Sequence, residues 1–313
     1  MTYLITGAAG FIGYHVCKRL LDMGKRVNGV DSVNTYYDIN LKHARLNNLN
    51  NYDKFMFYEG PVQNFIPHSL KSDYICHLGA YAGIPYSLEN PKIYEYNNSW
   101  GTFHMLERAR MWNVKNFVYA SSSSVYGESK EESIEDADVD NPLNMYAATK
   151  RYNELQARVY SSAYNVKCTG LRFFTVYGEW GRPDMAIYIW TDALYNNKVL
   201  KMNGYGKMER NFTFVDDVVD MILETLHIPQ EYVIYNIANT NSVDLNYVVT
   251  KLEELTGITG KKEYVSIPPG EINKSRANVD KLVSEFGYSP KVDIDEGLER
   301  FVQWYKFYYN IKE

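Results

Sequence analysis

Tyr146 and Lys150 are the residues whose types and spacing most directly suggest chemistry. On a helix, positions i and i+4 lie on one face, so the Lys150 ammonium stands beside the Tyr146 phenol. A neighbouring positive charge lowers the pKa of a phenol and lets it act as a general base near neutral pH. The YxxxK spacing does not select a pair by itself, because it also begins at Tyr14, Tyr126, Tyr247 and Tyr308.

A serine-rich segment indicates which of the five YxxxK pairs belongs to a site. Residues 120–127 read Ala-Ser-Ser-Ser-Ser-Val-Tyr-Gly at the end of an expected strand, and the Tyr146 copy is the one that follows it in the same half of the chain. Ligands of parallel sheets bind outside the carboxyl ends of the strands, which predicts that Ser122, Tyr146 and Lys150 lie together. Taken alone, the serines are explained about equally well by a turn of small residues that satisfies backbone groups.

A glycine motif near the amino terminus indicates a dinucleotide site. Residues 6–13 read Thr-Gly-Ala-Ala-Gly-Phe-Ile-Gly, between an expected strand and an expected helix. Glycine permits a tight turn and the close approach of a pyrophosphate, whose charge is stabilised at the amino terminus of the helix. The expected cofactor contacts are Gly7, Gly10, Phe11, Ile12 and Gly13.

Asp31 ends the next expected strand. A carboxylate at this place accepts hydrogen bonds from both hydroxyls of an adenosine ribose and repels a 2′-phosphate. The sequence therefore favours NAD over NADP. The competing interpretation, in which Asp31 only caps a turn, is weaker because the strand, the glycines and the spacing agree.

The elements that must position these residues alternate between strands and helices. Short apolar runs predict strands at 3–6, 26–30, 54–58, 74–78, 116–120 and 166–172. Helical patterns cover 11–23, 91–111 and 145–163 among these strands, and 185–196, 216–227, 245–256 and 294–309 after them. This alternation predicts an α/β fold with a doubly wound parallel sheet of the Rossmann type.

The alternation weakens after residue 173, which predicts two parts. Residues 1–172 form the expected NAD-binding domain, to which segments after 210 can return. Residues 173–313 form mainly a smaller α/β lobe that binds the substrate. No Pro/Ser-rich linker separates the parts, so we expect a shared interface with the substrate cleft between them.

The composition is that of a folded globular protein. The 313 residues carry 33 Lys and Arg against 38 Asp and Glu, a net charge of −5, without a basic block suited to nucleic acid. The longest uncharged run, 74–88, is too short and broken to span a bilayer. The glycine motif begins too early to leave room for a signal peptide. We therefore expect a cytoplasmic protein, with Cys17, Cys76 and Cys168 as reduced thiols rather than disulfides or metal ligands.

Together these motifs resemble the extended short-chain dehydrogenase/reductase family, within it the nucleotide-sugar 4-epimerases, and most closely the UDP-glucuronate 4-epimerases. The motifs are DSVNTYYDINLKHARL at 31–46, HLGAYAG at 77–83, SSSSVYG, YAATK, GLRFFTVYGEWGRPDMA at 170–186 and RNFTFVDD at 210–217. The resemblance implies that Tyr146 takes the proton of the sugar 4-hydroxyl while the C4 hydride passes to NAD⁺. The 4-keto sugar then receives the hydride on its other face. Ser122 would hydrogen-bond the reacting oxygen, and Lys150 would also hold the nicotinamide ribose.

The resemblance also implies a set of substrate contacts. The uridine diphosphate would meet Asn98, Arg210, Glu271 and Arg276, and the sugar would meet Ser123, Ser124, Thr175 and Arg182. An arginine suits a C5 carboxylate because its planar fork binds that group bidentately. The competing interpretations are an ion pair of Arg182 with Asp184 and a structural contact of Arg210 with Asp216 and Asp217. A homodimer formed by helices near 95–111 and 145–163 is implied as well.

Four positions depart from the family pattern. Pro61 replaces an Asp on the adenine side, and Gly79, Tyr81 and Pro85 replace Ala, Gln and Arg near the substrate. The leading hypothesis is an NAD-dependent epimerase that converts UDP-glucuronate to UDP-galacturonate. The alternatives are a neutral UDP-sugar epimerase, a decarboxylase or dehydratase, and a non-catalytic NAD-binding regulator. Dehydratases of the family that this chain resembles have Thr-Asp-Glu at the position where this chain has three serines, 122–124. The acid and base needed to remove water are therefore absent here, which counts against dehydration.

Overall fold

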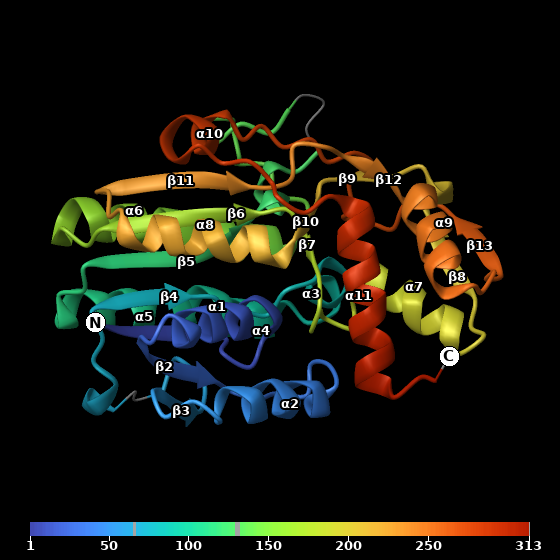
Figure 1. Ribbon diagram of the computed structural model, residues 1–313. Helices are drawn as coiled ribbons and strands as arrows, with labels where there is room; N and C mark the ends of the chain where they lie inside the picture. Colours follow the sequence, from blue (N-terminus) through green and yellow to red (C-terminus); the bar gives the residue numbers. More distant parts are fainter. Residues whose placement is uncertain (65–66, 129–131, 313) are drawn as a thin grey trace.

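The computed structural model describes residues 1–64, 67–128 and 132–312. A seven-stranded sheet runs through its centre with helices on both faces (Figure 1). In spatial order the strands are β11 (Tyr232–Ile237), β6 (Cys168–Phe173), β5 (Asn116–Ser122), β4 (Tyr74–His77), β1 (Thr2–Thr6), β2 (Arg26–Asp31) and β3 (Phe55–Glu59). Each of the pairings is parallel. The expected doubly wound Rossmann-type sheet is confirmed.

The chain reverses its path across the sheet between β1 and β4. From β1 it proceeds through β2 to β3 at one edge, and it then crosses back to β4 and continues toward the other edge. The carboxyl ends of β1 and β4 therefore flank the crevice in which doubly wound folds bind their ligands. One face is covered by α1 (Phe11–Asp22) and α8 (Val215–His227), and the other by α5 (Gly101–Trp112) and α6 (Met145–Tyr164) (Figure 1).

The alternation of side chains along the strands divides the core into two layers. In β1, Tyr3 and Ile5 pack in the layer that contains Leu20 of α1, whereas Leu4 packs in the layer that contains Leu106 of α5. All five side chains are fully buried. With both faces covered, the sheet is a rigid base for the loops at its carboxyl end.

The second half adds smaller elements beside the sheet. Three helices, α7 (Ala186–Tyr195), α9 (Leu245–Thr256) and α11 (Ile294–Tyr309), pack near the parallel pair of β8 (Leu200–Asn203) and β13 (Lys262–Val265). Two further pairs join β7 (Thr175–Tyr177) to β10 (Phe212–Phe214) and β9 (Glu209–Arg210) to β12 (Val243–Asp244). Through α8 and β11 the chain returns to the central sheet after residue 210.

Two helical regions differ from the sequence expectation. The sequence pattern does not reveal α2 (Ile39–Leu49), because its buried face carries Lys42 and Arg45, which hide the apolar periodicity. The helix expected at 91–111 consists of α4 (Pro91–Tyr94), a π-helical segment η2 (Glu95–Trp100) and α5. The remaining short helices are η1 (His68–Leu70), α3 (Ile84–Glu89), η3 (Ser123–Tyr126), η4 (Gly204–Gly206) and α10 (Asp280–Phe286).

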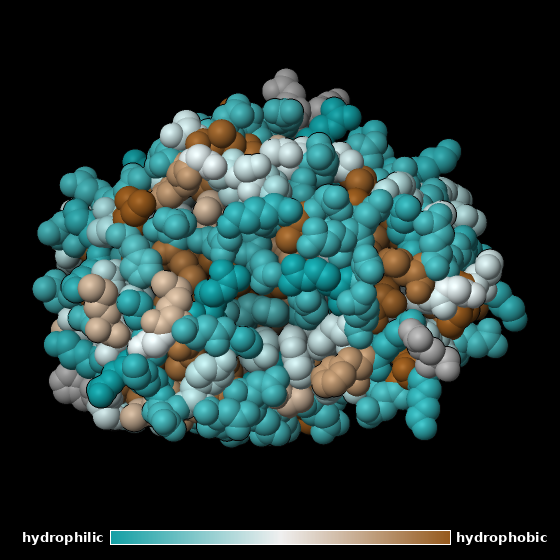
Figure 2. Space-filling view, viewed as in Figure 1, coloured by the Kyte–Doolittle hydropathy of each residue, from teal (hydrophilic) through white to brown (hydrophobic). Residues whose placement is uncertain are grey.

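The face of the molecule in Figure 2 is largely hydrophilic, and its hydrophobic side chains lie in scattered groups. Among the described helices, none has both the length and the apolar character needed to cross a membrane. Cys17, Cys76 and Cys168 are buried free thiols. Within the described ranges, no three His, Cys, Asp or Glu side chains gather in a way that could hold a metal ion.

Candidate active site

The glycine motif forms a tight loop between β1 and α1. Gly7 has a φ of 71°, and its N–H donates to the carbonyl oxygen of Val30 at 2.8 Å. A Cβ on Gly13 would lie 2.0 Å from the carbonyl oxygen of Gly7, so this position requires glycine. No side chain caps α1 at Gly10, so the N–H groups of the first turn, which begins at Phe11, are available for an anion. The loop therefore fits a dinucleotide pyrophosphate.

Asp31 lies beside this loop, at the carboxyl end of β2. Its carboxylate accepts hydrogen bonds from the N–H groups of Ala9 at 3.1 Å and Val33 at 2.8 Å. Burial raises the pKa of Asp31, and these two bonds and the charges of Lys42 and Arg45 oppose the rise. The carboxylate is thus fixed at the strand end, where dinucleotide-binding folds place the ligand of the adenosine ribose.

Ser122, Tyr146 and Lys150 come together at the carboxyl end of β5. The Ser122 hydroxyl is hydrogen-bonded to the Tyr146 phenol. The Nζ atom of Lys150 lies 5.9 Å from the centre of the Tyr146 ring and donates to the carbonyl oxygen of Ala120 at 2.8 Å. The three residues expected to be catalytic therefore form one constellation, on β5 and the first two turns of α6.

The pKa of the phenol differs from the sequence expectation. Burial raises the pKa of Tyr146, and the opposing influences are its hydrogen bond with Ser122 and the charge of Arg182. Burial also lowers the pKa of Lys150 to about 8. The expectation that Lys150 lowers the pKa of the phenol below its usual value is wrong for this structure. Desolvation of the phenol is the larger influence, and the ammonium is directed at Ala120.

Ser123 and Ser124 lie on the 3₁₀ turn η3 that follows β5. The N–H and the hydroxyl of Ser124 both donate to the hydroxyl oxygen of Ser122, at 3.2 and 2.8 Å. The turn satisfies local groups, as the competing interpretation of the serines requires. The same bonds also orient the hydroxyl of Ser122 toward the site, where Ser123 and Ser124 are half-buried.

Behind this turn lies a buried ion pair. Arg172 on β6 donates to both carboxylate oxygens of Glu154 on α6, at 2.8 and 2.9 Å, and both side chains are almost fully buried. Ser121 donates to Glu154 at 2.6 Å, and Arg172 donates to the Tyr126 hydroxyl at 2.9 Å. The network holds β5, β6, α6 and η3 in register around Ser122. Sequence reasoning misses it, because a glutamate on α6 has no pattern that marks it as buried.

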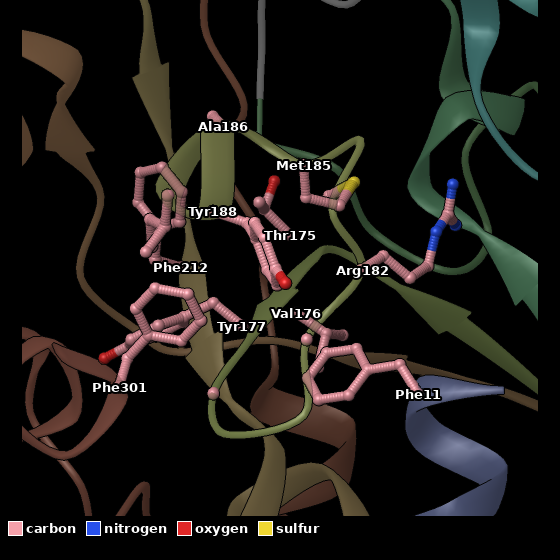
Figure 3. Close-up of a pocket in the computed structure, with 13 residues that line it drawn as sticks. Phe11, Thr175, Val176, Tyr177, Arg182, Met185, Ala186, Tyr188, Phe212 and Phe301 are labelled. Atoms are coloured by element: carbon pink, nitrogen blue, oxygen red, sulfur yellow. The ribbon is translucent and has the colours of Figure 1, made fainter. Parts of the chain in front are cut away.

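Thr175 and Arg182 line a small, partly open apolar pocket between α1 and the second half. Its aromatic walls are Phe11, Tyr177, Tyr188, Phe212 and Phe301, and the guanidinium of Arg182 extends away from them (Figure 3). Arg182 donates to Asp184 from Nε at 3.0 Å and from Nη2 at 2.5 Å. The ion pair of the competing interpretation is therefore present. It differs from an ordinary surface pair because the Arg182 side chain is only 19% exposed.

Arg210 and Glu271 form an ion pair with a separation of 3.1 Å. Arg210 is also held by the carbonyl oxygens of Glu209, Ile272 and Asn273, and burial lowers its pKa. The alternative contact of Arg210 with residues 216–217 is wrong, because those carboxylates bind other arginines and the backbone at 291–292. Arg276 is exposed, and its carbonyl oxygen accepts from the N–H of Ser133 at 2.8 Å.

Asn98 is fully buried on η2 and does not reach the surface of the site. Its amide oxygen accepts from the N–H of Tyr81 at 2.8 Å, and its amide nitrogen donates to the Tyr81 carbonyl oxygen at 2.9 Å and to the Thr149 hydroxyl at 3.1 Å. Asn98 thus joins the segment after β4 to α6, next to Lys150. This geometry does not support the expected contact of Asn98 with the uridine diphosphate.

Positions that depart from the family pattern lie around the same site. The N–H of Gly79 donates to the Thr6 hydroxyl at 3.0 Å, and a Cβ there would lie 3.1 Å from the nitrogen of Gly7. Pro85 is exposed on α3. Tyr81 belongs to a group of rings whose neighbouring centres lie between 5.0 and 6.4 Å apart: Tyr36, Tyr81, Tyr86, Tyr94 and Tyr146. Aromatic rings therefore line this side of the site up to Tyr146.

Comparisons with known proteins agree with this geometry. The model of the "NAD dependent epimerase/dehydratase family" matches residues 3–238. The chain is 40% identical to Protein CapI of Staphylococcus aureus over 99% of each chain. It is 38% identical to the UDP-glucuronate 4-epimerase of Thermodesulfobacterium geofontis, over 97% of this chain and 96% of that one. The crystal structure of UDP-glucuronic acid 4-epimerase from Bacillus cereus, in complex with UDP-glucuronic acid and NAD, matches with a TM-score of 0.94 and 30% identity over 99% of this chain and 100% of that chain. The chain belongs to the NAD dependent epimerase/dehydratase family.

Proposed function

We propose that the protein is an NAD-dependent 4-epimerase that converts UDP-glucuronate to UDP-galacturonate. One observation carries the choice of sugar: Arg182 lies close enough to Tyr146 for its charge to lower the pKa of the phenol. A hexose with its 4-hydroxyl at Tyr146 then has its C5 substituent near an arginine, and the planar fork of arginine suits a carboxylate. The names of the epimerases from Thermodesulfobacterium geofontis and Bacillus cereus support the same substrate.

The residues at the carboxyl ends of β1, β2 and β5 fit NAD. In this proposal the loop that contains Gly7, Gly10 and Gly13 holds the pyrophosphate, Asp31 holds the adenosine ribose, and Lys150 holds the nicotinamide ribose. When bound, NAD would supply a reversible hydride acceptor for C4 of the sugar. The overall reaction is redox-neutral, so turnover does not require release of the cofactor.

The chain's own residues move the proton and orient the sugar. Tyr146 removes the proton of the 4-hydroxyl and later returns it, and Ser122, hydrogen-bonded to the phenol, is placed to bind the same oxygen. Lys150, whose pKa is about 8, is still mainly charged at neutral pH and stands ready to hold the nicotinamide ribose, whereas Ser122 and Arg182 are the groups that favour the phenolate. Arg182 and Thr175 bind the carboxylate and restrict its rotation while the ring turns over.

The uridine diphosphate is assigned to the side of the site that contains Arg210. The pair of Arg210 and Glu271 fixes one edge of the segment 270–273, and Arg276 follows on the same stretch of chain. The hydroxyl of Ser123 supplies a further donor toward the sugar, and the Ser124 hydroxyl, whose hydrogen is donated to Ser122, offers its oxygen as an acceptor.

The homodimer is part of the proposal. Helices α5 and α6 expose apolar side chains that a monomer leaves in water: Met111, Tyr152, Leu155, Val159 and Tyr164. Because α5 and α6 pack side by side, exposed apolar side chains on both helices suit a protein interface, and a second copy of the chain is the occupant we propose. Introducing charge with Leu155→Glu and Val159→Glu together should convert a dimer to a monomer in light scattering. A wild-type protein that is monomeric would remove this part of the proposal.

The three buried thiols agree with a reducing compartment such as the cytoplasm.

The deciding experiment supplies UDP-glucuronate, UDP-glucose and UDP-N-acetylglucosamine to the purified protein and identifies the products by NMR. UDP-galacturonate with its carboxylate retained supports the proposal. Predominant formation of a UDP-pentose identifies a decarboxylase, and turnover of the neutral sugars alone identifies a neutral-sugar epimerase. No turnover of any of the three favours a non-catalytic NAD-binding protein.

A further inference from the structure

Asp184 holds the guanidinium of Arg182 by one edge. The contacts join Nε to Oδ1 at 3.0 Å and Nη2 to Oδ2 at 2.5 Å. This side-on arrangement occupies the Nε–Nη2 edge of the guanidinium and leaves its Nη1–Nη2 end available for another ligand. That end can take a second carboxylate in the same plane. Asp184 and a sugar carboxylate can therefore bind Arg182 at the same time, from different edges.

Tyr36 fixes Asp184 in turn. The Tyr36 hydroxyl lies 2.5 Å from the carbonyl oxygen of Ala82 and 3.3 Å from Oδ2 of Asp184. It donates to both of these acceptors. The guanidinium carbon of Arg182 lies 5.8 Å from the centre of the Tyr36 ring. A Cβ on Gly83 would lie only 2.6 Å from the Tyr36 hydroxyl oxygen, so this group has little room to move.

The backbone that carries the ion pair is anchored separately. The His15 ring donates to the carbonyl oxygen of Glu179 at 2.8 Å, and Arg45 donates to the carbonyl oxygens of Trp180 at 2.5 Å and Gly181 at 3.2 Å. These bonds fix the loop without touching the guanidinium of the next residue. The orientation of that guanidinium is therefore left to Asp184 and Tyr36.

We propose that Asp184 is a positioning residue that makes the enzyme selective for a carboxylate-bearing sugar, acting through Arg182. The inference rests on the proposed function and adds a residue to its specificity. Because Asp184 holds one edge, the free end of the fork meets the sugar at a single angle, and the entropy of orienting a long side chain is spent before the substrate binds. Tyr36 supports the same geometry from behind.

The test compares Asp184→Asn with wild type in binding and in turnover. An amide cannot accept two charge-assisted bonds from the guanidinium, so we expect the KM for UDP-glucuronate to rise about tenfold, the size of one such contact. Binding of UDP, measured by calorimetry, should be unchanged. Tyr36→Phe should move the KM in the same direction by less. Asp53→Asn and Tyr264→Phe, at exposed positions, serve as matched controls.

A double-mutant cycle separates positioning from a merely structural role. If Asp184 acts through Arg182, adding Asp184→Asn to Arg182→Leu should raise the KM for UDP-glucuronate no further. Additive losses would show that Asp184 serves the fold, and tighter binding of UDP-glucuronate by the Asn variant would show that Asp184 competes with the substrate. Either result overturns the inference, and Tyr36→Phe carries the test if the Asn variant does not fold.

The failure of this inference can be told from a failure of the proposed function. If the wild-type protein does not convert UDP-glucuronate, the proposed function is wrong. If it does convert this sugar and the Asn variant binds it as tightly as wild type, the assignment of Asp184 alone is wrong.

Discussion

The ammonium of Lys150 donates to the carbonyl oxygen of Ala120 at 2.8 Å, so a buried cation is tied to the backbone of β5 two residues before Ser122. The side chain is 3% exposed, and burial lowers its pKa to about 8. A lysine in this position stays charged at neutral pH, but its charge destabilises the folded protein. Function and stability therefore make opposite demands on this residue.

Replacing Lys150 with methionine should stabilise the nucleotide-free protein and abolish its turnover. A pKa lowered from 10.5 to about 8 corresponds to about 3 kcal/mol. Loss of the bond to Ala120 offsets part of this, so the free energy of unfolding should rise by on the order of 1–2 kcal/mol at pH 7. Urea denaturation measures it, with Lys71→Met as the exposed control.

The extra free energy of unfolding of the Lys150→Met variant should decrease as the pH rises. Between about pH 8 and 10.5 the unfolded wild-type chain binds more protons at this lysine than the folded protein does, so wild-type stability contributed by Lys150 rises with pH. The advantage of the methionine variant should shrink over this range. An advantage that stays constant or grows would contradict the assignment.

Replacing Tyr146 with phenylalanine should lower kcat by at least about a hundredfold, the usual contribution of a general base. Folding and NAD binding should be retained. Tyr247→Phe is a matched control, because Tyr247 and Lys251 have the same sequence spacing and the same 5.9 Å separation of ammonium and ring centre, but lie outside the site on α9. Near-normal turnover of the Tyr146 variant would remove the phenol from the mechanism.

The purified protein should contain bound NAD(H) rather than NADP(H), because the carboxylate of Asp31 repels a 2′-phosphate. Chromatography of nucleotide released by denaturation identifies the cofactor. Asp31→Asn should weaken the preference for NAD when both cofactors are titrated into stripped protein. Finding mainly NADP(H) in the wild-type protein would show that Asp31 has another role.

Replacing Arg182 with leucine should reduce kcat/KM for UDP-glucuronate about tenfold to a hundredfold more than for any neutral UDP-hexose that is accepted, since a charge-assisted contact contributes about 1.5–3 kcal/mol. Steady-state kinetics with both sugars measures the difference. Equal losses would assign Arg182 to the fold or to the nucleotide.

Much of the sheet half follows from the sequence, because strands buried on both faces read as short apolar runs. The predicted strand at 116–120 is β5, which extends two residues further to Ser122, and the predicted helix at 145–163 is α6. By contrast, α2 is hidden because charged residues occupy its buried face. Side-chain burial decides such cases, and a single sequence does not display it.

The catalytic group is predictable for a different reason than the substrate contacts. Ser122, Tyr146 and Lys150 are brought together by a strand end and one helix, which local patterns reveal. The role of Asn98 depends on a π-helical segment that turns its amide toward Tyr81. The contacts of Asp184 depend on a loop whose shape is fixed by distant residues, so spacing alone cannot distinguish a positioning carboxylate from a surface one.

Arg45 has a consequence for the order in which the molecule is built. This fully buried guanidinium donates to Ala9 in the glycine loop and to carbonyl oxygens 135 and 136 residues further along the chain. As the ribosome extends the chain, those two acceptors emerge long after the glycine motif itself. Until then the arginine keeps its water, because burying an unpaired cation is prohibitively costly. The amino-terminal half of a nascent chain therefore contains the glycine loop and its bonds to Val30 and Asp31, but the arginine that packs against this loop gains its remaining partners only once residues 180–181 have been synthesised.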